Sequence, residues 1–403
     1  MSFDPSAWLD EHRGKATLLG VCPMSPEIVQ ATLAEAASAD EFVPMFIATP
    51  RQVDANRGYT GWSQTDLVDV VARTADAAGY DGPTILARDH GGPYQSTRDR
   101  GDPSISLPDA MEYAEELFID DLEAGFDILH VDATEDATTT GPLDLEEIAR
   151  RTVTLIDRIE THRERKGIPP VQYEVGTEEI TGGMTAPEDF ERFIENLVSA
   201  LERAGRAPVV DRLLFVVGQI GTTMHIDMQN TFAPAKATEL TDIVGGHNLH
   251  LKVHYTDWLD DEELARFPTL GIGAANVGPE FAAAMVDGYE SLEYIEHDVV
   301  NEATDRSDFM TTFEAAAVRD APWQKFAPAG LETDQYPEFA AEHRREIAHC
   351  VGRYVFTDAD VEEARSTLYE NVADHAEETD PHEVVVGAVR QSIRRYIEAF
   401  NLA

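Results

Sequence analysis

Three consecutive stretches decide the fold of this chain: TILARDH (84–90), PDAMEYAEELFIDDLEAG (108–125) and DILHVDA (127–133). The first and third are short apolar runs with β-branched residues, which is typical of buried strands. The middle stretch repeats apolar residues at helical spacing, and it begins with a proline and an acidic first turn. A strand, a helix and a second strand of these lengths predict a unit of two parallel strands joined by a crossover helix.

The same alternation continues through residues 1–296. Eight such units favour a closed (β/α)₈ TIM barrel, and no G-x-G-x-x-G follows any strand to support an open dinucleotide-binding sheet. Residues 297–403 carry helical patterns without strand signals, and we predict that they form a C-terminal α-helical extension packed on the barrel. The eight predicted strands are 16–22, 43–49, 84–90, 127–133, 171–176, 212–220, 249–255 and 269–277.

The chain is strongly acidic, with 31 Lys and Arg against 76 Asp and Glu and a formal net charge of -45. This balance argues against nucleic acid and anionic membrane as partners, because both require a basic surface. Carboxylates spread over the whole chain while lysine is scarce, a pattern that indicates a halophilic protein whose self-repulsion is screened by salt. The hydrophobic fraction of 43% supplies a core and argues against disorder.

The sequence also predicts a cytoplasmic location. Its first fifteen residues lack the basic and apolar regions of a signal peptide. No run approaches the roughly 18 to 20 apolar residues that a membrane span needs. The two cysteines, Cys22 and Cys350, are far apart in sequence, which fits neither a disulfide framework nor a cysteine-based metal site. A soluble, reduced protein is therefore expected.

Polar side chains gather at the carboxyl ends of the predicted strands, where the reactive residues of a TIM barrel belong. Asp89 and His90 end the third strand, His225 follows the sixth, and His254 ends the seventh. Imidazoles from three strand ends suit a divalent metal ion, zinc first, with one coordination position left for substrate. We predict His90, His225 and His254 as metal ligands and the adjacent Asp89 as an acid or base.

Several neighbouring residues also have a structural interpretation. His130 and Asp132 could brace the barrel interior through a buried hydrogen bond, which we favour over metal ligation for this pair. Asn276 could cap the following helix. Arg88 and Lys252 are the only cations near the predicted centre by sequence. Backbone amides at a helix N-terminus could hold a phosphate without them, so the sequence leaves a phosphate site open.

Eight short motifs stand in order along the chain: GYTG (58–61), DHGGP (89–93), HVDAT (130–134), VGTE (175–178), HYTDW (254–258), PWQKF (322–326), GRYVF (352–356) and ENV (370–372). Taken together, these motifs resemble a known family, the Z-type subunits of class II D-tagatose-bisphosphate aldolases. The resemblance implies a TIM barrel with a helical C-terminal extension, and a role as a non-catalytic subunit that a catalytic partner needs for activity and stability. The likeness runs from about residue 10 to 372, which is most of the chain.

The catalytic class II aldolases offer a more distant comparison. In those enzymes an Asp-His pair ends a barrel strand, the Asp handles the proton at C4, and the His binds zinc. By this resemblance Asp89 and His90 match the pair. His225 in IGTTMH and His254 in KVH match the two further zinc ligands. The resemblance therefore implies a complete metal triad, which a purely structural subunit would not require.

The same comparison extends to residues around the triad. Asn276 is similar to an asparagine that positions the ketose, and Glu178 falls near a glutamate-rich motif, so both are candidate catalytic residues. We take Asp132, Tyr59 and Lys252 as candidate substrate-binding residues.

These expectations lead to one hypothesis and two alternatives. The leading hypothesis is a metal-dependent aldolase-type lyase that acts on a ketose or ketose phosphate of the tagatose or fructose type, through a metal-stabilised enediolate. YTDW (255–258) stands where the catalytic enzymes carry a Gly/Ser-rich phosphate loop, which allows a substrate with fewer phosphates or none. If the cleaved fragments recombine before release, the site becomes a C4-epimerase. The rival is a non-catalytic subunit in complex with a catalytic aldolase subunit, and a homo-oligomer also stays open.

Overall fold

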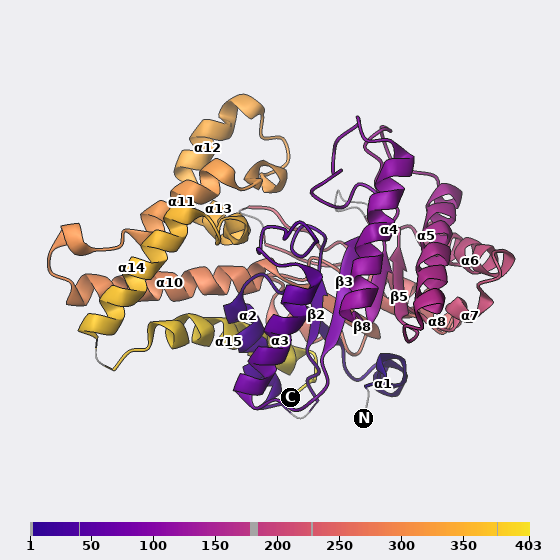
Figure 1. Ribbon diagram of the computed structural model, residues 1–403, viewed down its shortest axis with the longest axis horizontal. Coiled ribbons are helices and arrows are strands. Elements are labelled where there is room, and N and C mark those ends of the chain that lie inside the picture. The colour runs from indigo at the N-terminus through magenta and orange to yellow at the C-terminus, as the bar shows by residue number, and fades with distance from the viewer. Residues whose placement is uncertain (1–2, 40, 178–183, 227–228, 377) are drawn as a thin grey trace.

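The computed structural model describes residues 3–39, 41–177, 184–226, 229–376 and 378–403. Eight parallel strands close into a barrel in the order β1 to β8, with β8 paired to β1, which confirms the predicted TIM barrel (Figure 1). Seven strands lie within stretches that the sequence predicted, and β3 extends one residue beyond its predicted stretch 84–90. The strands are β1 (Leu18–Val21), β2 (Met45–Ala48), β3 (Ile85–Gly91), β4 (Ile128–Val131), β5 (Gln172–Gly176), β6 (Leu213–Val217), β7 (His250–Val253) and β8 (Ile272–Val277).

The helices between the strands begin and end at sequence signals. The side chain of Ser106 caps the first turn of α4, and Gly125 ends that helix with φ of 93°, a backbone angle that glycine adopts without a side-chain clash. A capping box between Ser63 and Asp66 starts α3. The helices that follow β1 to β7 are α2 (Pro26–Ala36), α3 (Gln64–Ala78), α4 (Leu107–Ala124), α5 (Leu145–Lys166), α6 (Pro187–Arg203) with the short α7 (Ala207–Val210), α8 (Pro234–Gly246) and α9 (Asp261–Leu264), and α1 (Pro5–His12) precedes the barrel.

The C-terminal part of the chain is helical, as predicted, and it lies beside the barrel (Figure 1). Among the described residues, no helix is both long enough and apolar enough to cross a membrane. The boundary predicted between 296 and 297 falls inside α10, so the division into two domains stays a prediction. The helices after β8 are α10 (Pro279–Val299), α11 (Phe309–Asp320), α12 (Tyr336–Glu342), α13 (Arg344–Val351), α14 (Ala359–His375) and α15 (Pro381–Ala399), with the single-turn segments η1 (Ala303–Asp305), η2 (Trp323–Phe326), η3 (Thr333–Gln335) and η4 (Gly352–Tyr354).

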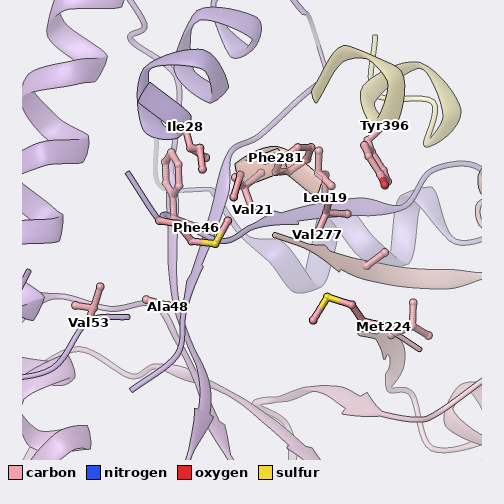
Figure 2. Close-up of a cluster of buried hydrophobic side chains, with 14 of the residues drawn as sticks. Leu19, Val21, Ile28, Phe46, Ala48, Val53, Met224, Val277, Phe281 and Tyr396 are labelled. Atoms are coloured by element: carbon pink, nitrogen blue, oxygen red, sulfur yellow. The ribbon is translucent and has the colours of Figure 1, made fainter. Parts of the chain in front are cut away.

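The last helix holds the extension against the barrel. α15 packs on α10 and on α2, which connects the end of the chain to its first βα unit. The buried carboxylate of Glu35 in α2 accepts hydrogen bonds from Arg390 and Arg394 of α15 at 2.7–3.0 Å. Apolar packing continues between the same elements. Figure 2 shows Leu19 and Val277 of the barrel wall near Phe281 of α10 and Tyr396 of α15.

Candidate functional site

A bulge in β3 turns two neighbouring side chains toward the same space. Arg88 pairs with Leu129 of β4, but the next paired residue is Gly91, so β3 uses three residues where β4 uses two. His90 takes a φ of 50° inside this bulge. Neighbouring side chains on a regular strand point to opposite faces, and a bulge removes that restriction. Asp89 and His90 consequently line one cavity at the carboxyl end of the barrel.

Four buried side chains from four different strands place their donor atoms together below this cavity. They are Asp89 of β3, His130 of β4, Glu174 of β5 and His254, which follows β7. Asp89 Oδ1 lies 3.4 Å from His130 Nδ1 and 3.5 Å from His254 Nε2. Glu174 Oε1 lies 3.3 Å from His130 Nδ1 and 3.5 Å from His254 Nε2. We call these four residues the donor cluster.

The separations within the donor cluster agree with a tetrahedral metal site. Zinc bonds to imidazole nitrogen and carboxylate oxygen are about 2.0–2.1 Å long, so neighbouring ligands of a tetrahedron lie about 3.3–3.4 Å apart. The four donor separations of 3.3 to 3.5 Å match that edge length. They exceed the usual 2.7–2.9 Å of a charge-assisted hydrogen bond. The spacing therefore suits a central cation better than direct hydrogen bonds.

Hydrogen-bond chemistry gives a second reason for a cation. In the tautomer that accepts the His90 backbone N–H at 3.2 Å, His130 Nδ1 carries a lone pair and no hydrogen. Two carboxylate oxygens, Asp89 Oδ1 and Glu174 Oε1, face that same nitrogen. Glu174 Oε1 accepts no hydrogen bond from the described residues. Acceptor atoms in contact repel one another in a buried site, and a bound cation removes that repulsion. The residues present thus fit a divalent metal.

Neighbouring positive charges keep both carboxylates of the donor cluster ionised. Burial raises the pKa of Asp89, but His254, His90, His130 and Lys252 together outweigh it and hold that pKa well below its usual range. Burial acts in the same direction on Glu174, yet Lys252 and the histidines lower its pKa to about 2. Lys252 Nζ donates to Glu174 Oε2 at 2.6 Å. Both carboxylates are therefore available as anionic ligands or proton acceptors at neutral pH.

His90 stands at the edge of the donor cluster and is oriented by a carboxylate. Its Nδ1 lies 2.8 Å from Asp132 Oδ2, which also accepts from Gln95, while Asp132 Oδ1 accepts from Thr134. Burial raises the pKa of Asp132. The hydrogen bond and the charge of His90 outweigh burial, so this pKa lies below its usual range. An ionised carboxylate on Nδ1 fixes the imidazole tautomer and makes the other ring nitrogen more basic. The ring of His90 lies 4.9 Å from that of His254.

The cavity above the donor cluster has a volume of about 240 Å³. Asp89, His90 and His254 line it, as do two of the predicted residues, Tyr59 and Asn276. The amide of Asn276 is buried, and neither its oxygen nor its nitrogen has a hydrogen-bond partner among the described residues. A buried amide without partners is costly unless a ligand supplies them. Asn276 is therefore placed to bind a ligand in the cavity.

Other predicted residues lie elsewhere. His225 lines a second, open pocket beside Trp258 and is not in the donor cluster. Lys252 is fully buried in the barrel interior against Glu174 and does not line the cavity. Asp132 lies behind His90, and it also does not line the cavity. Glu178 falls outside the described residues, so its predicted catalytic role stays a prediction.

Two members of the donor cluster, His130 and Glu174, are not among the predicted metal ligands, although both lie on predicted strands. The sequence favours His130 as a brace of the barrel and assigns no role to Glu174. His130 follows Leu129 in β4, and Glu174 precedes Val175 in β5. Neighbouring side chains of a strand point to opposite faces, so this alternation with apolar residues indicates that His130 and Glu174 face the barrel interior. An apolar pattern shows that a polar residue points inward, but it does not show which inward residues from other strands lie beside it.

The cavity also contains a carboxyl group that burial keeps protonated up to neutral pH. Asp257 Oδ1 accepts from the backbone N–H groups of Gly278 (3.0 Å) and Glu280 (2.8 Å) at the start of α10. Burial raises the pKa of Asp257 to about 7, more than these amides lower it. The folded chain then keeps a proton that the unfolded chain releases above about pH 4. By linkage, this group makes the fold less stable as the pH rises from 4 to 7.

We expect Asp257→Asn to stabilise the protein at pH 8 and to change its stability little at pH 4. The amide keeps an oxygen acceptor for both N–H groups and removes the buried charge. The gain in the free energy of unfolding should reach up to about 4 kcal/mol at pH 8. Urea unfolding at both pH values measures it. Asp242→Asn, at an exposed position of α8, is the matched control. An equal change in the free energy of unfolding of Asp257→Asn at the two pH values would contradict the raised pKa of Asp257.

The chain is a (β/α)₈ barrel whose polar side chains gather at the carboxyl ends of its strands, where barrels of this fold carry their sites. The family described as "D-tagatose-1,6-bisphosphate aldolase subunit GatZ/KbaZ-like" matches residues 8–385. The chain belongs to this family, which confirms the resemblance stated from its motifs.

Solved structures agree with this fold. The chain is similar to a protein from Sinorhizobium meliloti 1021 described as a probable tagatose 6 phosphate kinase, with 22% sequence identity and a TM-score of 0.77. That comparison covers 95% of this chain and 100% of the other. The fructose-bisphosphate aldolase of Campylobacter jejuni has 12% identity and a TM-score of 0.57, with coverage of 100% and 96%. At these identities the likeness describes the fold alone.

Proposed function

We propose that this protein is a metal-dependent aldehyde-lyase of the aldolase type that acts on a ketose or a ketose phosphate. The observation that carries the proposal is the donor cluster at the floor of a cavity whose wall holds the unpartnered amide of Asn276. A sugar offers several neighbouring oxygens, which suit both a metal and an amide. The family and the fold support aldolase-related sugar chemistry.

His130, Glu174 and His254 are the residues that would hold the metal, with its fourth position beside Asp89 left to the substrate, and zinc suits their mixture of imidazole and carboxylate. When bound, such an ion polarises a ketose carbonyl and its neighbouring hydroxyl. This assignment shares only His254 with the triad predicted from the sequence, His90, His225 and His254. It leaves His90 free of a ligand role and places it on the cavity wall.

The side chains of the cavity have distinct roles in this proposal. Asp89 is ionised and accepts the proton of a substrate hydroxyl, which is the first requirement of carbon–carbon bond cleavage between a carbonyl and that hydroxyl. His90, oriented by Asp132, exchanges a proton with the departing or returning fragment. Asn276 donates to one substrate oxygen and accepts from another, which fixes the sugar over the donor cluster.

The same residues would serve a C4-epimerase, because cleavage followed by recombination on the opposite face requires no further group. The description of the family as a subunit favours the other candidate, a non-catalytic partner in a complex with a catalytic chain. The donor cluster supports an active site over that role, since an interface function does not need buried acceptor atoms in contact. The acidic composition and the lack of an apolar span among the described helices support a salt-adapted cytoplasmic protein.

The purified single chain tests this proposal. Loaded with zinc in molar salt and screened against ketoses and their phosphates, it should cleave or epimerise at least one of them. We expect Asp89→Asn to lower kcat by about 100-fold to 10,000-fold, since a positioned acid or base contributes that much. Coupled assays for the aldehyde product and chromatography of the sugars separate lyase from epimerase. A chain without bound metal and without turnover would instead identify the non-catalytic subunit.

A further inference from the structure

The cavity has a positively charged wall that the proposed chemistry does not use. Arg51, Arg100, Lys325 and Arg353 all line it, in a chain where carboxylates outnumber cations by more than two to one. We propose that these four residues, here called the cation wall, bind the phosphate group of a phosphorylated ketose whose carbonyl end faces the donor cluster. The inference deepens the proposed function and rests on it for the orientation of the sugar.

The cation wall is assembled from distant parts of the chain. Arg51 follows β2, and Arg100 lies between β3 and α4. Lys325 belongs to η2 and Arg353 to η4, within the PWQKF and GRYVF motifs of the helical part of the chain. From the sequence, these motifs carry only the family resemblance. Their cations therefore reach the cavity only because the extension folds back over the mouth of the barrel.

The wall lacks the carboxylates that accompany most buried cations. Arg353 is only 6% exposed, yet no carboxylate oxygen of the described residues lies within 4.0 Å of its guanidinium. It donates to the backbone oxygen of Cys350 and lies 4.7 Å from the Tyr354 ring centroid. Arg51 contacts the same ring at 4.9 Å. Arg100 has one distant carboxylate partner, Glu135 at 3.8 Å, and donates to the amide oxygen of Gln95 at 3.4 Å. Burial lowers the pKa of Arg353, but Tyr354, Tyr59, Cys350 and Asp257 outweigh it and raise that pKa above its usual range, so the guanidinium stays charged. A charged guanidinium at a cavity wall with no carboxylate bound to it attracts an anionic ligand.

The cations also repel one another. Burial lowers the pKa of Lys325, and the positive charges of Arg100 and Arg51 lower it further. The Arg353 and Arg51 charges outweigh the effect of burial on Tyr354 and lower the pKa of its phenol. An arrangement of like charges around a cavity is the environment that an anion stabilises. The Tyr354 hydroxyl lies in the same wall and could donate to the anion as well.

A phosphate monoester matches this wall better than a single carboxylate does. It carries up to two negative charges and three terminal oxygens, and guanidinium groups bind such oxygens through paired hydrogen bonds. The polar groups of the cavity then divide into two sets. Asp89, His254 and Asn276 face the carbonyl end of the sugar, and the cation wall faces its phosphate end. The wall also gives an anionic substrate a local attraction on a protein of net charge -45.

Calorimetric titration of the full-length chain tests the wall without any turnover. The probes are fructose 6-phosphate, unphosphorylated fructose and inorganic phosphate at constant ionic strength. We expect fructose 6-phosphate to bind at least 10-fold more tightly than fructose. Lys325→Met should weaken fructose 6-phosphate by about 10-fold and leave fructose unchanged, because one charge-assisted hydrogen bond is lost. Lys166→Met on α5, also a loss of one exposed lysine charge, is the matched control and should leave both affinities unchanged.

The same titrations with Arg51→Met provide a second, independent measurement, so a folding defect in one variant does not decide the result. Equal affinities for fructose and its phosphate, or equal losses in the Lys325 and Lys166 variants, would overturn the proposal. A ketohexuronate that binds as tightly as the phosphate, with the same dependence on Lys325, would replace phosphate by carboxylate and overturn it too. If the chain binds the phosphorylated sugar more tightly but shows no turnover, the cation wall is supported and the proposed enzymatic activity is refuted.

Discussion

The His130→Ala variant is expected to lose its divalent metal, with an affinity at least about 100-fold below that of the parent chain. His130 Nδ1 is the donor atom that faces both carboxylates of the donor cluster, at 3.4 Å and 3.3 Å. Without it, two negative oxygens and one imidazole remain, and the tetrahedron is incomplete. Equilibrium dialysis with elemental analysis measures the affinity, and circular dichroism verifies that the variant is folded.

His225→Ala is the decisive control for this experiment. The sequence predicts His225 as a ligand, whereas the structure places it in a separate pocket beside Trp258. We expect full metal occupancy in this variant. Loss of metal from His225→Ala together with retention in His130→Ala would restore the ligand set His90, His225 and His254 and refute the donor cluster.

Replacing Asp121 by asparagine is expected to lower the free energy of unfolding by about 3–5 kcal/mol. Arg88 and Asp121 are both fully buried, and Arg88 Nε lies 2.8 Å from Asp121 Oδ2. The same guanidinium donates to the backbone oxygens of Ala48 and Val53 at 2.8 and 2.9 Å. Asparagine leaves the buried guanidinium without a counter-charge. Denaturant unfolding followed by circular dichroism measures the change.

Two variants separate the charge from other effects at this position. Asp120→Asn removes a neighbouring, partly exposed carboxylate and should cost less than about 1 kcal/mol. The double variant Arg88→Met with Asp121→Leu removes both charges and should recover much of the lost stability, because apolar residues often replace a buried ion pair at little cost. A single Asp121→Asn change of less than about 1 kcal/mol would show that the pair adds little.

The structure explains how a protein with a strongly negative net charge can bind an anionic sugar. A surface of net charge -45 repels anionic sugars, and by sequence alone Arg88 and Lys252 were the cations available to offset it. Both are fully buried and paired, with Asp121 and Glu174 respectively. The cation wall supplies a positive field at the cavity in their place. An acidic surface and a phosphorylated substrate are therefore compatible in one protein.

The sequence by itself determined the architecture. Strand and helix periodicities are local properties, and turn and cap residues such as Ser106 and Gly125 sit within a few residues of the ends they define. The alternation of eight strands with helices therefore identified the closed barrel, and the motifs identified the family. The rule that reactive residues occupy strand ends located Asp89, His90, His254 and Asn276 at one cavity.

The tertiary structure alone decided which residues share a site. The bulge in β3 turns Asp89 and His90 to the same side, and no local pattern marks it. Pairing of β3 with β4 and of β4 with β5 brings His130 and Glu174 to Asp89. Closure of the barrel adds His254 and leaves His225 apart. Folding of the extension brings its cations to the barrel mouth across more than 200 residues of chain. Periodicity is a local property that fixes the face on which a residue lies, whereas contacts between strands and with the extension depend on register and closure, which are properties of the whole chain.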